Sequence, residues 1–308
     1  MKKILVLVLA LGCLTACSKT GQEPAPAPPV QETPSNPDPQ KPQKPDPEKP
    51  NVPELHYISK IEFLDEQQRV HHMVQYSYDE AMRLSSLEEH YSRGTNVDVY
   101  TGGTNVDVYT GKLSYEAASV LMTYDNDKHQ KNLVKPTEYR LFLDEASKRA
   151  TKLEETIFFE GSEPEVRREA DNTFDDFGRR TSYISPFMRL VSLTWRENNL
   201  EKVLYERDEF SVTEMRAYSQ VKNNVYPDLN FLQRRLLFAP EYQYLWTEQL
   251  GIRSHHLMSR LERSSKERAD LNRQITYKYD LDAKGRPIRI TIQNEGDVSV
   301  IVLTYVER

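Results

Sequence analysis

The stretch Tyr277–Gln293, YKYDLDAKGRPIRITIQ, has the pattern of a β-hairpin. Apolar and polar residues alternate on both sides of a short polar centre, which indicates strands with one buried face. In that centre, Asp282 can accept backbone N–H groups at the start of a turn. Gly285 can supply the positive φ that a short hairpin loop needs, and Arg286 begins the return strand. The stretch therefore predicts two antiparallel strands joined by a tight turn.

The same signal, an acid followed four residues later by arginine, recurs between strand-like runs along the chain. The five matches are Asp65 with Arg69, Asp79 with Arg83, Glu145 with Arg149, Asp175 with Arg179, and Asp282 with Arg286. Serial hairpins of this kind predict a mainly β fold. We expect residues 54–308 to form a single domain with an antiparallel hairpin or meander sheet, partly closed and barrel-like.

Residues 226–251, YPDLNFLQRRLLFAPEYQYLWTEQLG, interrupt the β pattern. Asp228 can cap a helix, and Leu229, Leu232, Leu236 and Leu237 would share one helical face. Gly251 is a natural C-terminal cap. We therefore predict a short helical insertion near residues 228–250, which plugs or covers one end of the sheet.

A nonapeptide, GTNVDVYTG, occurs at residues 94–102 and again at 103–111. Identity over nine residues indicates a recent duplication. The copies could pair about Gly102 and Gly103, since a Gly-Gly pair suits a hairpin turn. We expect an extended hairpin or a long exposed loop.

The N-terminus has the features of an export signal. Lys2 and Lys3 precede an apolar run, Ile4–Leu11, which is too short to span a bilayer. Residues 1–16 are therefore interpreted as a signal peptide. The tetrapeptide LTAC, residues 14–17, resembles the lipobox of bacterial lipoproteins. That resemblance implies cleavage before Cys17 and acylation of this residue, palmitate being a typical chain, so that the membrane is a partner through the lipid. Ser18 then favours the outer membrane, with the periplasmic or surface face left open.

A proline-rich segment follows the proposed anchor. Twelve of the 18 prolines lie between Glu23 and Pro53, and apolar side chains are too few to bury a core. Polyproline II geometry gives such a segment a maximum reach of roughly 90 Å. We expect residues 17–53 to be a lipid anchor and disordered linker, a stalk between membrane and domain.

Composition excludes several function classes. The net charge is −6 and no basic stripe is present, so nucleic acid is not expected as a partner. Cys13 lies in the signal peptide and Cys17 is the proposed anchor, and there is no other cysteine. The mature domain therefore lacks structural disulfides, cysteine-ligated zinc and cysteine nucleophiles.

The second half of the chain, from Tyr139 to Arg308, resembles a known family. The segments LTWRENNLEKVLY (193–205), PDLNFLQRRL (227–236), LGIRSHHLMSRL (250–261) and the closing hairpin are similar to bacterial envelope domains of unknown function with a porin-like fold. Members of that family are typically lipoproteins built of many antiparallel strands. The resemblance implies a fold but no chemistry, and the duplicated nonapeptide departs from the family pattern.

Candidate catalytic and binding residues are few. The pairs His71–His72 and His255–His256 would point to opposite faces of a strand, so neither predicts a metal site. Adjacent acids, Glu88–Glu89, Glu154–Glu155 and Asp175–Asp176, cannot face each other as glycosidase carboxylates must. No cofactor motif is present. Trp195 and Trp246 can stack on a sugar, although core packing is the simpler role for each.

Two classes of function remain. The first is a non-enzymatic envelope protein that binds a glycan or lipid or serves as a structural element. The alternative is a carbohydrate hydrolase with an unrecognised carboxylate pair, which would require two buried carboxylates facing one cleft. The strands carry too many charges for a lipid-facing barrel. We therefore expect a water-soluble domain tethered only through Cys17, its barrel filled by side chains or by a small apolar ligand.

Overall fold

The computed structural model describes residues 55–92, 99, 106–125, 136–185, 187–232 and 243–307. The chain divides into two units, Met1–Asn51 and Val52–Arg308, and all described residues belong to the second. The expected signal peptide, Cys17 and the whole of the linker lie outside the described residues.

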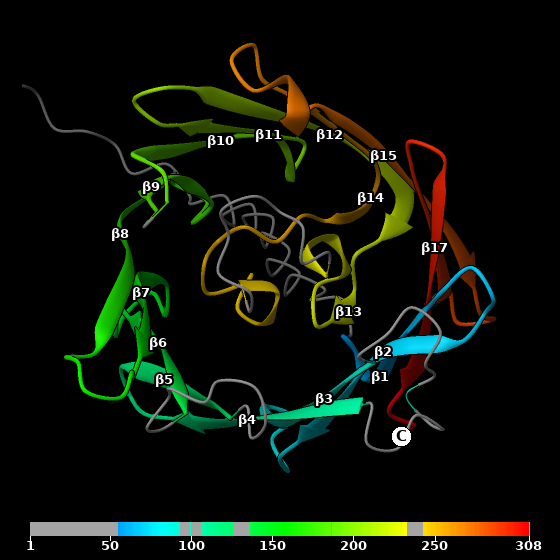
Figure 1. Ribbon diagram of the computed structural model, residues 1–308, viewed down its shortest axis with the longest axis horizontal. Coiled ribbons are helices and arrows are strands. Elements are labelled where there is room, and N and C mark those ends of the chain that lie inside the picture. Colours follow the sequence, from blue (N-terminus) through cyan, green and yellow to red (C-terminus); the bar gives the residue numbers. More distant parts are fainter. Residues whose placement is uncertain are drawn as a thin grey trace, which may run out of the picture. The chain divides into compact units, whose positions relative to one another are not determined.

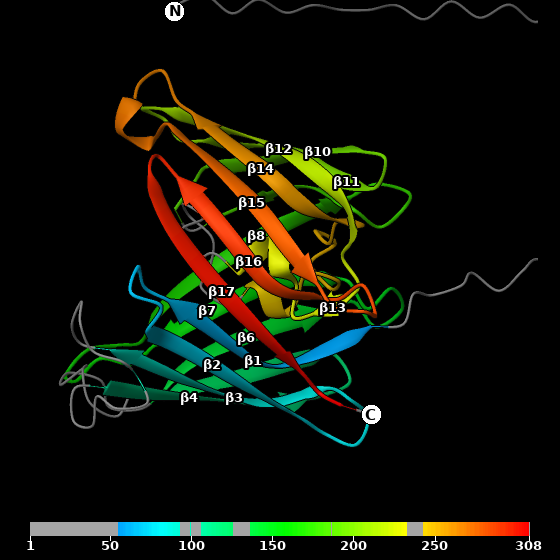
Figure 2. The ribbon, with the colours of Figure 1, turned by 90° about the vertical axis from the view of Figure 1, so that its right-hand side faces the viewer.

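The second unit is a closed antiparallel β-barrel of 16 strands (Figures 1 and 2). Each strand pairs with its neighbours along the chain, and β17 returns to pair with β1, which completes the ring. The predicted mainly β fold is confirmed, and its closure is complete rather than partial. The strands are β1 (His56–Leu64), β2 (Val70–Tyr78), β3 (Leu84–Ser92), β4 (Val106–Tyr115), β5 (Ser119–Asp125), β6 (Thr137–Leu143), β7 (Ala150–Ile157), β8 (Glu165–Phe174), β9 (Arg180–Ile184), β10 (Leu190–Arg196), β11 (Asn199–Glu206), β12 (Ser211–Lys222), β14 (His256–Ser264), β15 (Arg273–Leu281), β16 (Pro287–Asn294) and β17 (Asp297–Tyr305).

Four of the five acid–arginine turns form as predicted. In the β15–β16 hairpin, Asp282 Oδ1 accepts the backbone N–H of Arg286 at 2.9 Å, and its Oδ2 accepts the guanidinium Nε at 2.7 Å. The turns at Asp65, Asp79 and Asp175 repeat both bonds. The residue before each arginine has positive φ, as this loop type requires: Gln68, Met82, Gly178 and Gly285.

The β6–β7 turn differs from the prediction by one residue. The acid that organises it is Asp144, not Glu145, because the Asp144 carboxylate accepts the N–H of Ser147 at 2.8 Å. The N–H of Asp144 donates to the carbonyl of Arg149 at 2.9 Å, so this loop is one residue longer than the others. Lys148 takes the positive φ of 55°.

These turns make stability sensitive to acid. Hydrogen bonds from the backbone N–H and guanidinium of Arg83 lower the pKa of Asp79 from its ordinary value of 3.8. Partial burial alone would raise the pKa of Asp282, but the N–H and guanidinium of Arg286 lower it overall. A carboxylate whose pKa is lower in the folded than in the unfolded protein contributes its full stabilisation of the fold at pH values above the unfolded pKa. This contribution is lost as the pH falls through the folded pKa.

We therefore predict a melting temperature that falls steeply only below about pH 4, the unfolded pKa of Asp. The double variant Asp79→Asn, Asp282→Asn should melt lower at pH 7 and lose part of the acid slope. Calorimetric melting between pH 7 and pH 2.5 measures both. Equal slopes for the variant and the wild type would show that these turns do not hold their carboxylates ionised.

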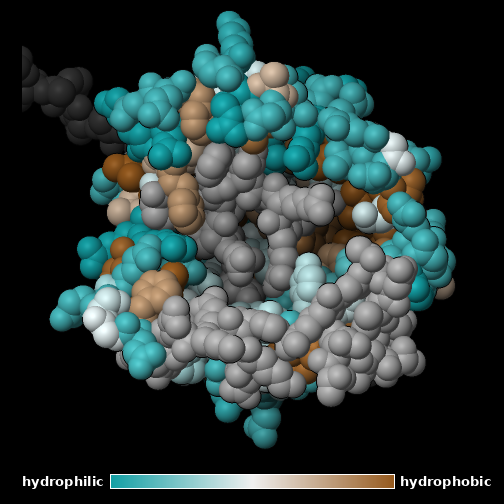
Figure 3. All heavy atoms as spheres, viewed as in Figure 1, coloured by the Kyte–Doolittle hydropathy of each residue, from teal (hydrophilic) through white to brown (hydrophobic). Residues whose placement is uncertain are grey.

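The two faces of the barrel wall differ in polarity, although the inner face also holds buried ion pairs and the outer face exposes apolar residues such as Val166, Met215 and Val298. Residues opposite each other in a ladder share a face, and the inward rows are buried and mostly apolar. Leu303, Ile61 and Val74 form one such row, and Leu261 and Ile275 another. The outward face carries exposed or half-exposed polar and charged residues on many strands: Gln75, Lys112, Lys152, Arg168, Arg196, Arg260, Glu262, Lys278 and Gln293. Figure 3 looks onto one end of the barrel, where hydrophilic residues predominate along the upper rim and hydrophobic patches lie at the left and right.

The described parts of the connection between β12 and β14, residues 223–232 and 243–255, lie inside the ring and are called the plug below (Figure 1, yellow to gold). The plug contains β13 (Val225–Tyr226), η2 (Leu229–Phe231) and η3 (Gln243–Leu245). The insertion and the cap are confirmed, since Asp228 accepts the N–H of Asn230 at 3.0 Å. The described parts hold single 3₁₀ turns, however, rather than the α-helical face expected. Residues 233–242 lie outside the described residues.

The plug is attached to widely separated strands of the wall. β13 pairs in parallel with β1. The carbonyl of Gln249 accepts the N–H of Ala150 on β7, and that of Gly251 accepts the N–H of Arg180 on β9, both at 2.9 Å. A Cβ on Gly251 would lie 2.7 Å from the carbonyl oxygen of Gly178, so glycine permits this close approach as well as the φ of +64°. The plug is thereby held across the barrel interior.

Of the duplicated nonapeptide, the second copy contributes Val106–Gly111 to β4, where it pairs with β3. In the first copy only Val99 is described, and its N–H donates to the carbonyl of Val70 at 2.8 Å. The expected pairing about Gly102 and Gly103 lies outside the described residues.

Candidate functional site

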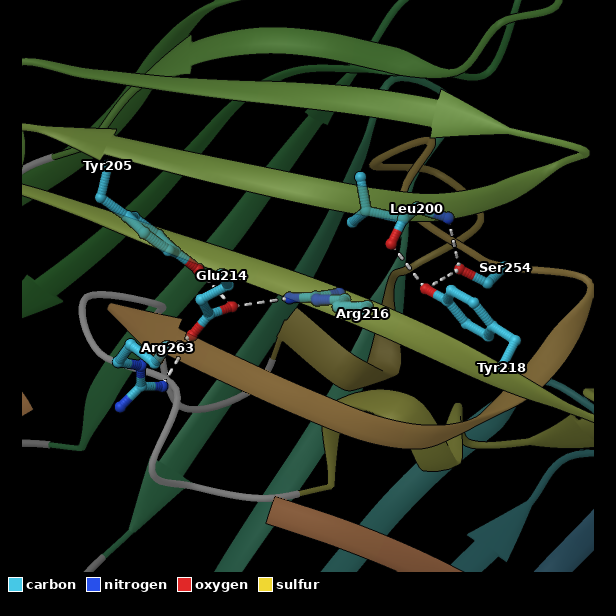
Figure 4. A network of polar contacts seen from close by, with 7 residues as sticks. All are labelled: Leu200, Tyr205, Glu214, Arg216, Tyr218, Ser254 and Arg263. Carbon is cyan, nitrogen blue, oxygen red and sulfur yellow. Dashed lines mark hydrogen bonds and ion pairs between the residues drawn. The ribbon is translucent and has the colours of Figure 1, made fainter. Parts of the chain in front are cut away.

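A buried ionic cluster lies on the inner wall where β12 meets β14 (Figure 4). Glu214, Arg216 and Tyr218 are alternate residues of β12 and therefore share its inward face. Arg263 lies opposite Glu214 on β14. The carboxylate of Glu214 accepts Arg263 Nη2 at 2.7 Å through Oε1 and Arg216 Nη2 at 3.1 Å through Oε2. Two guanidinium groups thus share one carboxylate.

Burial makes these charges strongly coupled. The side chains of Glu214, Arg216 and Arg263 are exposed by 0%, 2% and 4%. Burial alone would raise the pKa of Glu214, but the charges of Arg216 and Arg263 lower it overall. Burial and the charge of Glu214 raise the pKa of Tyr205 well above its ordinary value. At neutral pH the cluster therefore holds an ionised carboxylate, two cations and a neutral phenol.

Arg216 lies between the wall and the plug. Its guanidinium carbon is 5.2 Å from the ring centre of Phe231, which belongs to η2 of the plug. Its Nη2 donates to Glu214, and its Nε and Nη1 are buried without a hydrogen bond of ordinary geometry. The guanidinium also interacts with the hydroxyl of Tyr218: burial raises the pKa of this hydroxyl, and the guanidinium opposes the rise.

The end of the plug is hydrogen-bonded to the wall beside this cluster. The hydroxyl of Tyr218 donates to the carbonyl of Leu200 on β11 at 2.7 Å and lies 3.0 Å from Ser254 Oγ. Ser254 Oγ also accepts the N–H of Leu200 at 3.1 Å. Because Ser254 belongs to the plug, these bonds hold the residues after Gly251 against β11 and β12.

Two further polar clusters are buried in the wall. On β8 and β9, Glu169 accepts Arg180 Nη2 at 3.0 Å. On β2 and β3, Glu89 is hydrogen-bonded to His72 and accepts the hydroxyl of Tyr124 at 2.8 Å. Like Glu214, these two glutamates each have a basic partner. In the described part of the chain, no group of three His, Cys, Asp or Glu side chains is arranged to hold a metal ion.

The two candidate tryptophans lie on different elements. Trp246 follows η3 in the plug, is 2% exposed and belongs to the main hydrophobic core. Trp195 on β10 is half-buried, and its indole N–H donates to the carbonyl of Arg180 at 2.8 Å. Their role in ligand binding stays a prediction, as does the lipidation of Cys17.

The sequence pattern did not single out Glu214, Arg216 and Arg263 as candidate site residues. The spacing Val212, Glu214, Arg216 offered a signal, because it continues the period of two from an apolar residue into charged ones. A strand with charges in its apolar row either turns that row to solvent or buries an ion pair.

No protein-family model and no curated protein matches the chain. Solved structures are similar to it. A porin-like protein from Bacteroides uniformis ATCC 8492 is 13% identical, with a TM-score of 0.54 over 81% of this chain and 100% of that one. A porin-like protein from Bacteroides vulgatus ATCC 8482 is 11% identical, with a TM-score of 0.48 over 82% and 100%.

The first likeness defines the class of fold, a porin-like β-barrel, in agreement with the expected resemblance. At this identity the likeness establishes the fold alone. Within the described residues, no helix combines the length and apolar character needed to cross a membrane.

Proposed function

We propose that this chain is a non-enzymatic lipoprotein of the bacterial cell envelope, tethered to the outer membrane through Cys17, whose barrel stands clear of the bilayer and holds a lipid-like ligand. The observation that carries the proposal is the polarity of the barrel wall. Buried apolar rows face inward and charged side chains face outward.

A membrane-spanning barrel has the opposite arrangement. Its outward residues form an apolar band, and its interior is polar. On β7 and β8 the outward face carries Lys152, Glu154 and Arg168, which form ion pairs with one another. An Arg or Lys on a lipid face costs about 2–4 kcal/mol at the bilayer midplane. Such a wall is stable in water and unstable in lipid, which makes a separate anchor necessary.

The interior also argues against a channel. The plug contributes Leu229, Phe231, Leu245, Trp246 and Leu250 to the same hydrophobic core as the wall. The apolar part of the interior favours an apolar or amphipathic ligand over a glycan, because the buried polar groups beside it are mostly paired with one another and a glycan needs many polar partners. Trp246 lies in this core and is therefore the better placed of the two tryptophans to contact such a ligand.

The alternative, a carbohydrate hydrolase, receives less support from the buried carboxylates. A glycosidase needs one carboxyl with a raised pKa as the general acid. The pKa of Glu214 is lowered instead, and Glu89 and Glu169 are each paired with a basic side chain. These contacts are those of structural ion pairs.

The tether is tested by removing the anchor in the full chain. We expect Cys17→Ser to move the protein from the membrane fraction to the soluble fraction of lysed cells. Intact mass of the wild-type protein should begin at Cys17 and include acyl chains. A Cys17→Ser protein that still requires detergent for extraction would contradict the tether. A Ser18→Ala variant, altered at the next residue only, is the matched control and should stay in the membrane fraction.

A further inference from the structure

One end of the barrel, called the closed end below, is where β1 starts and β17 reaches the C-terminus (Figure 2, right). Tyrosines toward the ends of β2, β4, β12, β15 and β17 each donate a hydroxyl to a backbone carbonyl near the start of the preceding strand. The bonds run from Tyr78 to Ile58, Tyr115 to Leu84, Tyr218 to Leu200, Tyr279 to Met258 and Tyr305 to Pro287. These tyrosines belong to the main hydrophobic core or pack against it, so their rings occupy the interior at this end.

The plug is attached at the same end. Its hydrogen bonds to β1, β7, β9 and β11 are made by residues at or next to the start of those strands: His56, Ala150, Arg180 and Leu200. The strands β1, β7, β9 and β11 all run away from the closed end, because each strand is antiparallel to its neighbours along the chain. The tyrosine rings and the plug therefore block one end of the barrel together.

At the opposite end, called the open end below, the inner wall of β3 is exposed. Tyr91, near the end of β3, lies opposite His72. His72 shares the inward face of β2 with Val74, which belongs to the main core, so Tyr91 also faces inward. Tyr91 is nevertheless 37% exposed. Solvent therefore reaches the inner wall at this position.

The inner wall is exposed on β8 as well. Arg167, near the start of β8, lies opposite Glu155, which lies opposite the buried core residue Tyr139. Arg167 therefore faces inward, yet its side chain is 34% exposed. The ring centre of Phe187 lies 5.8 Å from its guanidinium carbon, and Phe187 is 40% exposed. Access at the open end thus extends to strands well separated around the ring.

Aromatic rings connect the open end with the core. The ring centres of Tyr91 and His72 are 4.5 Å apart, and those of His72 and Phe63 are 4.4 Å apart. Phe63 in turn packs against the main core. Rings with one end in solvent and the other in an apolar core suit a ligand that is polar at one end and hydrocarbon at the other.

We propose that the ligand enters through the open end and binds with its hydrocarbon chain against Tyr91 and Phe63, while the closed end admits none. The inference rests on the proposed function, in which the interior holds a lipid-like ligand, and it adds the route of entry and the binding surface. The occupant is the chain of a single-chain amphiphile.

Single cysteines can report access, because the mature full chain carrying Cys17→Ser contains no cysteine. Tyr91→Cys places a thiol at the open end. Ala150→Cys places one at the closed end, where Ala150 is 0% exposed. A water-soluble maleimide should label Tyr91→Cys at least about tenfold faster than Ala150→Cys, since a fully buried thiol reacts only when the fold opens locally. Intact mass measures both rates.

A ligand then tests the binding surface. Calorimetry gives the Kd of sodium dodecanoate for the Cys17→Ser parent and for each cysteine variant, and labelling is repeated at ten times that Kd. We expect labelling of Tyr91→Cys to slow by about tenfold, because the free site is then the minor form. Gln75→Cys, on the outward face of β2, is the matched control and should react at an unchanged rate. A folded Tyr91→Cys protein that loses the binding shown by the parent would equally place the ligand at Tyr91.

The outcomes separate the inference from the proposed function. If the parent binds dodecanoate but labelling of Tyr91→Cys is not slowed, the lipid-like ligand stands and the binding surface is elsewhere. If Ala150→Cys is labelled as fast as Tyr91→Cys, the closed end is not closed. If the parent binds no dodecanoate, the ligand of the proposed function is wrong and the inference fails with it. The protection of Tyr91→Cys decides the matter even where Ala150→Cys does not fold.

Discussion

Replacing Glu214 with leucine is expected to lower the free energy of unfolding by about 3–5 kcal/mol. The substitution leaves Arg216 and Arg263 buried beside each other without the carboxylate that both now bind. Removing one partner of a buried ion pair is far more costly than replacing the whole pair, because the remaining charge is neither solvated nor paired. Urea unfolding followed by circular dichroism measures the loss.

A matched control lies one residue from Arg263. Glu262 is on the outward face of β14, with its side chain 47% exposed. Glu262→Leu should change stability by no more than about 0.5 kcal/mol, as most surface substitutions do. If Glu214→Leu were as mild as this control, the cluster would not be the buried, charge-coupled site described above.

Truncating Trp246 to alanine is expected to cost about 3–5 kcal/mol, the usual range for a buried tryptophan. Its side chain is 2% exposed in the core shared by plug and wall, so the truncation opens a cavity that neither element can close alone. Phe177, in the β8–β9 turn, is 77% exposed and serves as the control. Thermal unfolding of both variants measures the difference.

An outcome with Trp246→Ala as stable as Phe177→Ala would mean that the plug contributes little to the fold. The barrel would then be stable when empty, and the interior would be open to larger ligands than the proposed function allows.

The hairpins could be predicted because their information is local. An aspartate four residues before an arginine satisfies the turn within a single loop, as Asp282 and Arg286 do. The same local logic failed by one residue at Asp144, because the acids at 144 and 145 are equivalent in pattern and only the backbone shows which one accepts the N–H of Ser147. The residues that form each turn could be predicted from the sequence, but the length of the loop could not.

Closure of the ring could not be predicted in the same way. It depends on the pairing of β1 with β17, for example of Ile61 with Leu303, and almost the whole sequence of the unit separates these two strands. No turn signal marks such a contact. The prediction of a helical face in the plug was wrong for a related reason. Leu229 and Leu232 have helical spacing, but here their burial comes from contact with the surrounding wall, which single 3₁₀ turns achieve equally well.

The ionic cluster illustrates what pattern alone leaves out. In the sequence, Glu214 and Arg216 have the pattern of a solvent-exposed strand face. Their partner Arg263 comes 49 residues after Glu214, beyond the plug segment in the sequence. Only the register of β12 against β14 brings them together. Charges within an otherwise apolar inward row are the feature to look for in such barrels.

We propose that the barrel is stable in water rather than in lipid. The most direct measurement is to express residues 54–308 without the anchor and examine them in detergent-free buffer by light scattering, then add them to planar bilayers. The inward apolar rows and the outward charges predict a soluble, monodisperse protein that produces no ion conductance. A fragment that folds only in detergent and conducts ions across the bilayer would contradict the claim.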